Sequence, residues 1–441
     1  MVTLVNRAKM TTATTGTGTI TLGTAEAGYQ SFADAGVVDT NVVRYVIEDG
    51  TAWEIGTGTY SAGTLTRTVA ESSNADAALN LTGSAVVYVS ATAADIPPVL
   101  ELYAENYVSG TLPIATGEDA FVIGRNSTSS GQRSVALGAY STASGTFSVA
   151  VSGSVASGTN SVGILGSATQ NGATAIGSNS TLKAAQAVGQ GAMALGGSRA
   201  SGTDSFAAAI TTNSATYGAT GANSVAIGYL AKASNTDAVA IGGEQSFASG
   251  GNSFAAGGEF QTASGAMAVA LGGSVNTASG EASYAYGKRS LADKVGKYAY
   301  GAQLVGTSGV TQSGMMVLIA ATADVTPNIL RSNTNAATTI NQVILPNNSA
   351  YAFHGTIVAR QQASQGTACA AWKIEGLIRR EGSAGTTVLV NSATTVLDNT
   401  PAWGMALSAD TTNGGLKIEV TGAAATNIRW VATINTSEVT Y

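Results

Sequence analysis

Two glutamates occupy the same place in consecutive copies of a short repeat, and their spacing could support carboxylate chemistry. GGEQS (242–246) and GGEFQ (257–261) contain Glu244 and Glu259. If the repeats stack as neighbouring strands, the two carboxylates lie about 5 Å apart. That is the separation of the two carboxylates in a retaining glycosidase. The alternative is a weakly repulsive pair of charges on an exposed loop.

A site that cleaves polysaccharide also needs side chains that shape the substrate. Phe247 and Phe260 are the aromatic residues beside the glutamate pair. We therefore predict that the protein is not an enzyme, and we keep Glu244 and Glu259 as the catalytic candidates of the alternative hypothesis.

Histidine and cysteine chemistry is restricted by number, because the chain contains one of each, His354 and Cys369. This excludes a disulfide framework and a Cys/His metal cluster within one chain. His354 is expected to be packed or solvated; three copies meeting on an axis to hold an ion is the alternative. Cys369, close to Trp372, is predicted to be a small buried side chain. We expect no metal and no cofactor. We also expect no nucleotide-binding loop, since no GxxxxGK[ST] motif occurs.

Aromatic residues near the end of the chain could stack on sugar rings. Tyr351, Trp372 and Trp430 lie in strand-like runs, which favours core packing for them. Trp403 follows DNTPA (398–402), a turn-like segment, and is therefore predicted to be exposed. We take Trp403, Tyr351 and Trp372 as the candidates for receptor contact.

The elements that must position these residues begin with a repeated phrase between residues 121 and 301. SVALG (134–138), SVAIG (224–228), AVAIG (238–242) and KYAYG (297–301) are four of its copies. The closing glycines at 228, 242, 257, 272, 287 and 301 are separated by one repeat each, 14 or 15 residues. A period this short predicts one coil of a β-solenoid per repeat.

Strand alternation predicts which side chains each coil buries. In SVAIG (224–228), we expect Val225 and Ile227 to fill the inside, and Ser224 and Ala226 to form a small, flat outer face. Two or three aliphatic side chains per coil contribute about 4–8 kcal/mol, whereas ordering a coil costs roughly 14 kcal/mol or more. Packing the outer faces of several chains would supply the missing burial. We therefore predict a homo-oligomer, with three-fold symmetry favoured because three flat faces close around one axis.

The flanks of the repeats predict two further β-domains. Residues 1–96 contain VVRYVIEDGTAWEIG (42–56), in which Asp49-Gly50 is a hairpin signal, followed by the strand-like runs 64–69 and 84–90. Residues 97–120 are predicted to be a linker with room for one helical turn. Residues 302–441 contain short apolar runs separated by turn signals such as Asn413-Gly414, which predicts a β-sandwich of jelly-roll type.

The junction between the repeats and the last domain is rich in tyrosine and basic residues. Tyr284, Tyr286, Tyr298 and Tyr300 occur close to Lys288, Arg289, Lys294 and Lys297. We interpret this cluster as a collar where the solenoid widens into the last domain; a receptor patch is the alternative.

Charge and hydropathy exclude several partners. Charged residues make up 10% of the chain, and the net charge is −6. No segment is a basic patch, so nucleic-acid binding is not expected. No run approaches the roughly 20 apolar residues of a membrane span, and the start, MVTLVNRAKMTTATTG, lacks the apolar region of a secretory signal.

The repeats and their ASGTxS turns, such as ASGTDS (200–205), resemble the heads of trimeric autotransporter adhesins, the YadA-like heads. The resemblance covers about 180 of the 441 residues. It implies a left-handed parallel β-roll in which three chains associate, and binding to host surfaces.

The flanks resemble fibre proteins of tailed bacteriophages. The N-terminal similarity lies in MVTLVNRAKMTTATTGTGTITLGTAEAGYQSFADAG, and the C-terminal similarity lies in 345–361, 370–382 and 407–434. This resemblance implies that residues 1–96 anchor the protein to the tail, baseplate or capsid of a virion and that residues 302–441 form the distal tip.

Taken together, these observations predict an all-β, trimeric phage tail fibre located in the virion and assembled in the host cytoplasm. Its tip would attach multivalently to a host surface glycan or protein. The alternatives are a structural fibre without a receptor, such as a head fibre or spacer, and a tailspike that depolymerises glycan.

Overall fold

The computed structural model describes residues 2–95, 110–177, 184–210, 214–302 and 306–441. It divides into two compact units, Met1–Asn106 and Tyr107–Tyr441. The all-β prediction is confirmed: two short 3₁₀ turns, η1 (Ala93–Asp95) and η2 (Ala384–Thr386), are the helical elements among the described residues.

The first unit is a small β-domain built around the predicted hairpin. β4 (Val42–Asp49) and β5 (Ala52–Ser61) pair antiparallel on either side of the turn at Gly50. The φ of Gly50 is +64°, a left-handed backbone conformation that favours glycine. The seven-stranded sheet runs β1-β9-β4-β5-β6-β3, with β7 against β5, and β2 pairs β8 separately. The other strands are β1 (Lys9–Thr12), β2 (Thr15–Gly16), β3 (Ile20–Thr21), β6 (Thr64–Leu65), β7 (Thr68–Ser72), β8 (Leu81–Thr82) and β9 (Ala85–Val89). Its core includes the fully buried Phe32, Tyr45 and Ile47.

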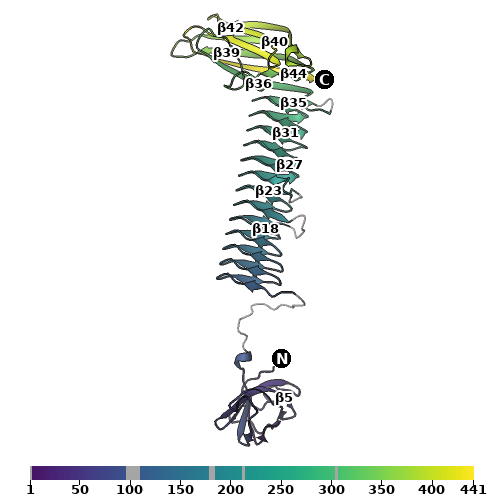
Figure 1. Ribbon diagram of the computed structural model, residues 1–441, viewed down its shortest axis with the longest axis vertical. Helices are drawn as coiled ribbons and strands as arrows, with labels where there is room; N and C mark the ends of the chain where they lie inside the picture. The colour runs from purple at the N-terminus through teal and green to yellow at the C-terminus, as the bar shows by residue number, and fades with distance from the viewer. Residues whose placement is uncertain (1, 96–109, 178–183, 211–213, 303–305) are drawn as a thin grey trace. The chain divides into compact units, whose positions relative to one another are not determined.

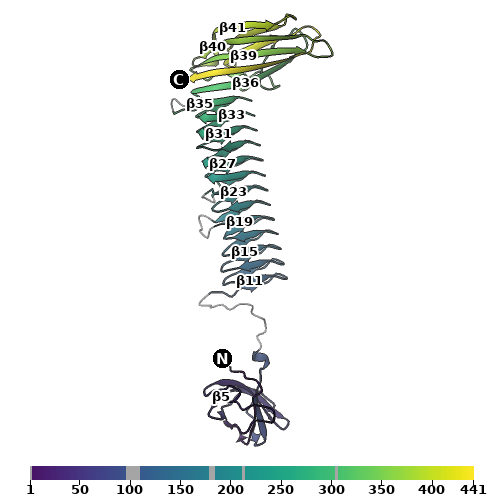
Figure 2. The same cartoon turned by 180° about the vertical axis from the view of Figure 1, so that it is seen from behind.

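A parallel β-solenoid forms most of the second unit, as predicted, with successive coils stacked in two columns of strands (Figure 1). The odd-numbered strands form the column that is labelled in Figure 2. They are β11 (Phe121–Ile123), β13 (Val135–Leu137), β15 (Val149–Val151), β17 (Val162–Ile164), β19 (Thr174–Ile176), β21 (Met193–Leu195), β23 (Phe206–Ala208), β25 (Val225–Tyr229), β27 (Val239–Glu244), β29 (Phe254–Ala256), β31 (Val269–Ser274), β33 (Tyr284–Lys288) and β35 (Tyr298–Ala302).

The even-numbered strands form the second column, a 13-stranded parallel sheet. They are β10 (Ile114–Ala115), β12 (Thr128–Ser129), β14 (Thr142–Ala143), β16 (Val155–Ala156), β18 (Gly166–Ala168), β20 (Ala185–Ala187), β22 (Arg199–Ala200), β24 (Gly218–Ala219), β26 (Lys232–Ala233), β28 (Phe247–Ala248), β30 (Thr262–Ala263), β32 (Thr277–Ala278) and β34 (Leu291–Ala292). β10 pairs β12, so the solenoid begins inside the predicted linker 97–120. Residues 97–109 of that linker lie outside the described residues, and its described part, 110–120, contains no helical turn.

Small side chains, mainly alanine and serine, fill the interior of the solenoid, which reverses the predicted orientation of the strands. Ala226 and the alanines in register with it are fully buried, whereas Val225 and Ile227 face outward and are half-buried. Ala233, on the facing strand β26, is also fully buried. The two columns approach so closely that small side chains fill the inward positions, so the branched side chains occupy the outer face.

Glycines permit this close stacking at two kinds of position. Gly228, which closes the repeated phrase, has a φ of +122°, in the region that favours glycine. Gly145, in an ASG turn, lies so close to the next coil that an added Cβ would be 2.0 Å from the Gly158 carbonyl oxygen. At both positions any side chain would either strain the backbone or collide with the next coil.

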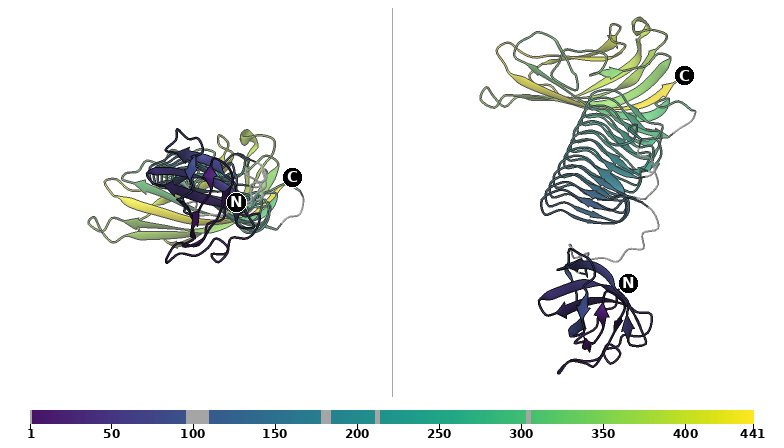
Figure 3. Two further views of the ribbon diagram at one scale, coloured as in Figure 1. Left: turned by 90° about the horizontal axis from the view of Figure 1, so that it is seen from below. Right: turned by 60° about the horizontal axis from the view of Figure 1, so that its bottom comes forward.

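The C-terminal domain continues the odd-numbered sheet. β36 (Thr311–Thr322) pairs antiparallel with β35, and the sheet proceeds through β44 (Ile428–Thr440), β39 (Ser349–Gln361), β40 (Cys369–Arg380) and β41 (Val388–Asp398). A second sheet joins β37 (Asn328–Ile329), β38 (Val343–Ile344), β42 (Gly404–Asp410) and β43 (Gly415–Thr421). Figure 3 shows the long strands of the first sheet lying across the end of the coils. One apolar core that includes Phe353, Ile374 and Trp430 involves both sheets, because Leu416 and Ile418 of β43 belong to it.

Candidate interaction surface

The outward face of the odd-numbered sheet is apolar along the whole solenoid. Each three-residue strand core directs its first and third side chains outward, and the register aligns them in two ladders. The first ladder is Phe121, Val135, Val149, Val162, Thr174, Met193, Phe206, Val225, Val239, Phe254, Val269, Tyr284 and Tyr298. The second is Ile123, Leu137, Val151, Ile164, Ile176, Leu195, Ala208, Ile227, Ile241, Ala256, Leu271, Tyr286 and Tyr300.

Thr174 is the one polar residue in these two ladders, which we call the apolar ladders. Several members remain well exposed in the single chain, for example Ile176 at 42% and Met193 at 41%. Monomeric soluble proteins rarely expose a continuous apolar patch of this length. The ladders therefore mark a surface that is suited to being covered by protein.

The predicted collar is present where the solenoid meets the C-terminal domain. Tyr284 stacks on Tyr298 with ring centroids 5.3 Å apart, and Tyr286 contacts Tyr300 at 4.9 Å. Beneath them, the Lys297 ammonium lies 2.7 Å from the Glu438 carboxylate, and both side chains are buried. Gln312 and Thr436 also donate hydrogen bonds to Glu438, at 2.6 and 2.7 Å. The cluster joins the two parts of the sheet.

The same outward face continues into the C-terminal domain. Tyr298 lies beside Met315 across the β35–β36 pair. Further along, Ile319, Val431 and Val358 form a row across β36, β44 and β39, with exposures of 36%, 45% and 52%. The outer face of this sheet is therefore partly apolar as well.

The two candidate carboxylates are aligned as predicted but lie in an open ladder. Glu244 pairs in parallel register with Glu259, and Glu259 pairs with Ser274. In the same column, Tyr229 pairs with Glu244 from the preceding coil, and Lys288 pairs with Ser274 from the following coil. Glu259 and Phe260 are exposed, so the glutamates face solvent along a column of mixed polarity.

The three aromatic candidates for receptor contact are all buried. Trp403 is 5% exposed, and Tyr351 and Trp372 are each 3% exposed. The predicted exposure of Trp403 is wrong because the Asn399 side chain closes the turn. Its oxygen Oδ1 accepts from the Trp403 backbone amide at 2.9 Å, and its NH₂ group donates to the Trp403 carbonyl oxygen at 2.8 Å. A buried ring cannot stack on a sugar without unpacking the core.

Tyr351 is enclosed beneath the collar. Burial, followed by the negative charges of Glu438 and Asp293, raises the pKa of Tyr351 well above its ordinary value. The Lys297 ammonium lies 5.8 Å from the centre of its ring. Tyr351 therefore belongs to the junction between solenoid and C-terminal domain.

His354 and Cys369 both lie on the outer face of the C-terminal sheet. His354 is exposed on β39, with Glu375 opposite it on β40 and Asn435 opposite it on β44. The predicted burial of Cys369 is wrong: the thiol is exposed. Strand alternation explains this, since Cys369 and Trp372 are three residues apart and point to opposite faces of β40.

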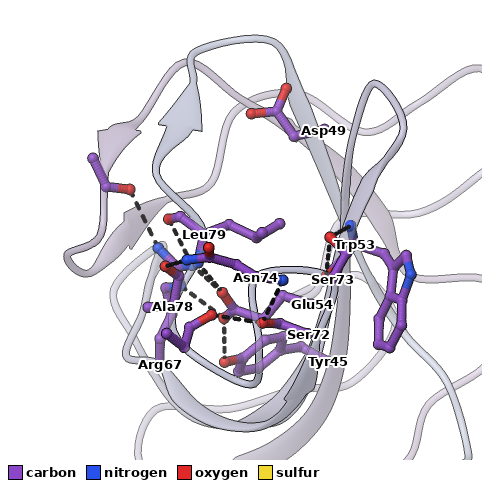
Figure 4. A network of polar contacts seen from close by, with 12 residues as sticks. Tyr45, Asp49, Trp53, Glu54, Arg67, Ser72, Ser73, Asn74, Ala78 and Leu79 are labelled. Carbon is purple, nitrogen blue, oxygen red and sulfur yellow. Dashed lines mark hydrogen bonds and ion pairs between the residues drawn. The ribbon is translucent and has the colours of Figure 1, made fainter.

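A buried ion pair organises the N-terminal unit (Figure 4). The fully buried Glu54 carboxylate accepts hydrogen bonds from Arg67, from the Tyr45 hydroxyl at 2.7 Å and from the Leu79 amide at 2.8 Å. Burial alone would raise the pKa of Glu54, but the hydrogen bonds, that of Arg67 foremost, outweigh it and hold the pKa below its ordinary value. Burial and the hydrogen bond to Glu54 raise the pKa of Tyr45. Both Glu54 oxygens are engaged, so the network serves stability.

The described ranges contain neither a cluster of metal-binding side chains nor a helix suited to crossing a membrane. No group of three or more histidine, cysteine or acidic side chains is arranged to hold a metal ion there. In the same ranges, no helix has the length and apolarity that crossing a membrane requires.

Two solved structures show weak similarity to the chain. The tailspike protein of Acinetobacter phage vB_ApiP_P1 is 8% identical, with 75% of this chain and 55% of the tailspike covered and a TM-score of 0.16. The tailspike protein of Acinetobacter baumannii phage AM24 is 10% identical, with coverages of 74% and 56% and a TM-score of 0.15. The match thus extends over little more than half of each tailspike, and at these scores it supports no conclusion.

The family comparison concerns the solenoid. No curated protein matches the chain. Residues 115–141, 129–151 and 219–244, however, match the YadA head domain repeat. The solenoid is therefore similar to the repeats of an adhesin head.

Proposed function

We propose that the protein is a homotrimeric fibre of a tailed bacteriophage that attaches to a host surface without cleaving it. Residues 1–96 would dock on the virion, the solenoid would serve as the shaft, and residues 302–441 would contact a surface glycan or protein. Attachment would gain strength from three equivalent weak sites on one shaft.

The observation that supports this proposal most strongly is the pair of apolar ladders. In a monomer the outer sides of these apolar side chains stay in contact with water. Burying them is favourable, since about 25 cal/mol of free energy is gained for each Å² of apolar surface removed from water. Covering the ladders with two further copies of the chain stabilises coils whose own apolar interior is almost entirely alanine. The match to the YadA head domain repeat supports both the trimer and an adhesive role.

The trimer is tested by light scattering on the purified full-length protein. We expect a mass of about three times the 43.7 kDa of one chain. Ile227→Glu combined with Ile241→Glu places charges at adjacent rungs of one ladder and should lower the mass or abolish soluble protein. Asn252→Glu, a charge on an exposed turn, is the control and should leave the mass unchanged. A monomeric parent protein would contradict the proposal.

Attachment is tested separately, with the parent protein as a competitor. Purified protein should bind the surface of susceptible bacteria and block adsorption of the phage that carries it. Stable trimers that bind no bacterial surface would favour the structural fibre, which acts as a head fibre or spacer.

The register of Glu244 and Glu259 favours one second candidate, a depolymerising tailspike. We expect no release of reducing ends from host polysaccharide. Release that disappears in the Glu244→Gln/Glu259→Gln variant, while the variant stays trimeric, would establish the enzyme instead.

A further inference from the structure

Two arginines lie directly opposite each other at one end of the C-terminal sheet. Arg429 of β44 is in register with Arg360 of β39, and both side chains are exposed on the outer face. Their neighbours in the same row are Ala321 on β36 and Cys369 on β40. Like charges directly opposite on adjacent strands are destabilising, so this pair needs an explanation.

No acidic side chain of the described residues forms an ion pair with this arginine pair. In the part of the chain that the structure describes, no ion pair includes Arg360, Arg429 or the nearby Arg331. Arg360 donates to the carbonyl oxygen of Ala368 at 3.1 Å. Asp324, the carboxylate closest in sequence to this end of β36, accepts from the Thr326 amide at 2.7 Å. Arg331 donates to Asn328 and to the carbonyl oxygen of Ile329, so the guanidinium groups of Arg360 and Arg429 are the ones available to an external anion.

The pair borders two hollows in the surface. One, of about 560 Å³, is lined by Arg360, Arg429, the last β39 residue Gln361 and the loop residues Gln362 and Asn427. The other, of about 320 Å³, is lined by Arg331, Asn333 and again Arg429. Arg429 therefore lines both hollows, together with Arg360 in the larger one and Arg331 in the smaller one. Together they exceed the volume of a single small anion.

Neutral amide groups line the larger hollow and are held in place. The Asn427 side-chain NH₂ donates to the side-chain oxygen Oε1 of Gln362 at 3.1 Å. The Asn427 backbone amide donates to Oε1 of Gln365 at 2.7 Å. Because the Gln362 oxygen is occupied, its NH₂ group is the part left to donate to a ligand. Fixed amides beside cations suit a molecule that carries both hydroxyl groups and an anionic group.

The position of the pair also suits a terminal binding site. β35 pairs with β36 as far as Met315, whereas β36 continues to Thr322. Ala321, which flanks Arg429, lies about 20 Å beyond Met315 at about 3.3 Å per residue. This end of the sheet projects past the coils, on the side away from the C-terminus (Figure 1).

We infer that Arg360 and Arg429 bind the anionic group of an acidic saccharide, with the sugar ring in the hollow beside Gln362 and Asn427. The inference rests on the proposed attachment function and specifies its ligand class. The two guanidinium groups clamp one oxyanion. The side-chain amides of Gln362 and Asn427 form hydrogen bonds with the ring hydroxyls. A free phosphate would leave the larger hollow empty.

The test is binding of full-length protein to an array of neutral, carboxylated and phosphorylated oligosaccharides. We expect binding to acidic members, and the carboxylated and phosphorylated arms identify which oxyanion is preferred. Arg360→Gln and Arg429→Gln should each weaken it about tenfold or more, the effect of losing one charge-assisted hydrogen bond. Lys373→Gln removes a charge from β40, which carries Cys369 of the arginine row, and should leave binding unchanged.

Several outcomes would overturn the inference. These are binding to neutral saccharides alone, no binding to any acidic saccharide, or acidic binding that survives the double Arg360→Gln/Arg429→Gln substitution. A change in the mass of the double variant would place the arginines between copies of the chain and also overturn it. Bacterial attachment that is unaffected in the double variant refutes this site but leaves the proposed function intact, whereas a parent protein that attaches to nothing counts against the proposed function itself.

Discussion

The Lys297 ammonium and the Glu438 carboxylate, 2.7 Å apart and both buried, link the last coil of the solenoid to the last strand of the chain. The two residues are 141 positions apart. Gln312, at the start of β36, contributes a third side chain to the same junction. The stability of the C-terminal domain and that of the final coil are therefore coupled.

Removing one partner of this ion pair should be costly. Glu438→Gln leaves a buried ammonium without a counter-ion, and we expect a loss of about 3–5 kcal/mol in the free energy of unfolding. Urea unfolding followed by tryptophan fluorescence measures it, since Trp372, Trp403 and Trp430 all lie in this domain. The double variant Lys297→Met/Glu438→Leu should recover much of the loss, because apolar residues can replace a buried pair. A double variant no better than Glu438→Gln would contradict this account.

The alanine interior should not tolerate a larger side chain. Ala226→Val inserts two methyl groups where the columns of strands leave room for one, and we expect a destabilisation of about 1–3 kcal/mol. The control is Ala266→Val, the same enlargement at an exposed turn residue. Thermal unfolding by circular dichroism should show a lower melting temperature for Ala226→Val alone. Equal effects of both substitutions would show that the interior is less tightly packed than the structure indicates.

Asn276 should be among the most sensitive polar residues of the solenoid. Its NH₂ group donates to the carbonyl oxygens of Gly272 at 2.6 Å and Gly287 at 2.8 Å, and its oxygen accepts from the Ser290 amide at 3.0 Å. Asn276→Ala leaves these buried groups unpaired, at about 1–3 kcal/mol each.

The matched substitution for that experiment is Asn252→Ala, at an exposed turn. Hydrogen–deuterium exchange should accelerate around residues 272–290 in Asn276→Ala and stay unchanged in Asn252→Ala. Unchanged exchange in both variants would mean that water replaces the amide without cost.

Acid should destabilise the N-terminal unit through Glu54. Because hydrogen bonding lowers the folded-state pKa of Glu54, its carboxylate stabilises the fold above the ordinary glutamate pKa of about 4.3. That contribution is lost as the pH falls through the lowered folded-state value. Hydrogen exchange of residues 42–89 should therefore accelerate steeply in this acidic range.

Two glutamine variants separate this effect from general acid unfolding. Glu54→Gln should exchange faster than the parent at neutral pH and lose the extra acid dependence. Glu71→Gln, which changes an exposed glutamate of β7, should behave as the parent does. Identical acid profiles in Glu54→Gln and the parent would remove Glu54 as the cause.

The period of the repeats sufficed to predict the solenoid, but it could not assign its two faces. Strand alternation places Val225 and Ala226 on opposite sides, yet nothing in the pattern says which side is inside. A coil of 14 or 15 residues leaves little room between its columns, and this volume limit, not hydrophobicity, selects Ala226 for the interior. The larger side chains then form the apolar ladders, which sequence reasoning assigned to the core.

The errors in the C-terminal domain have similar causes. Trp403 follows a turn-like sequence, and only the pair of hydrogen bonds from Asn399 shows that the turn folds it inward. Cys369 lies close to the buried Trp372 in sequence, which suggests burial. The alternation of side chains along β40 places its thiol on the opposite, exposed face. Arg360 and Arg429 are 69 residues apart in sequence, so their juxtaposition depends on the β39–β44 register and has no local signal.

The antiparallel pairing of β36 with β35 has a consequence for assembly. A parallel stack ends in a row of unpaired backbone groups, and such an edge can recruit a further strand from another molecule. β36 occupies this edge in the opposite direction, so a coil of the same kind cannot be added there. The number of coils is thus limited by a physical stop at this end, and solenoids of different molecules cannot join through it into longer fibrils.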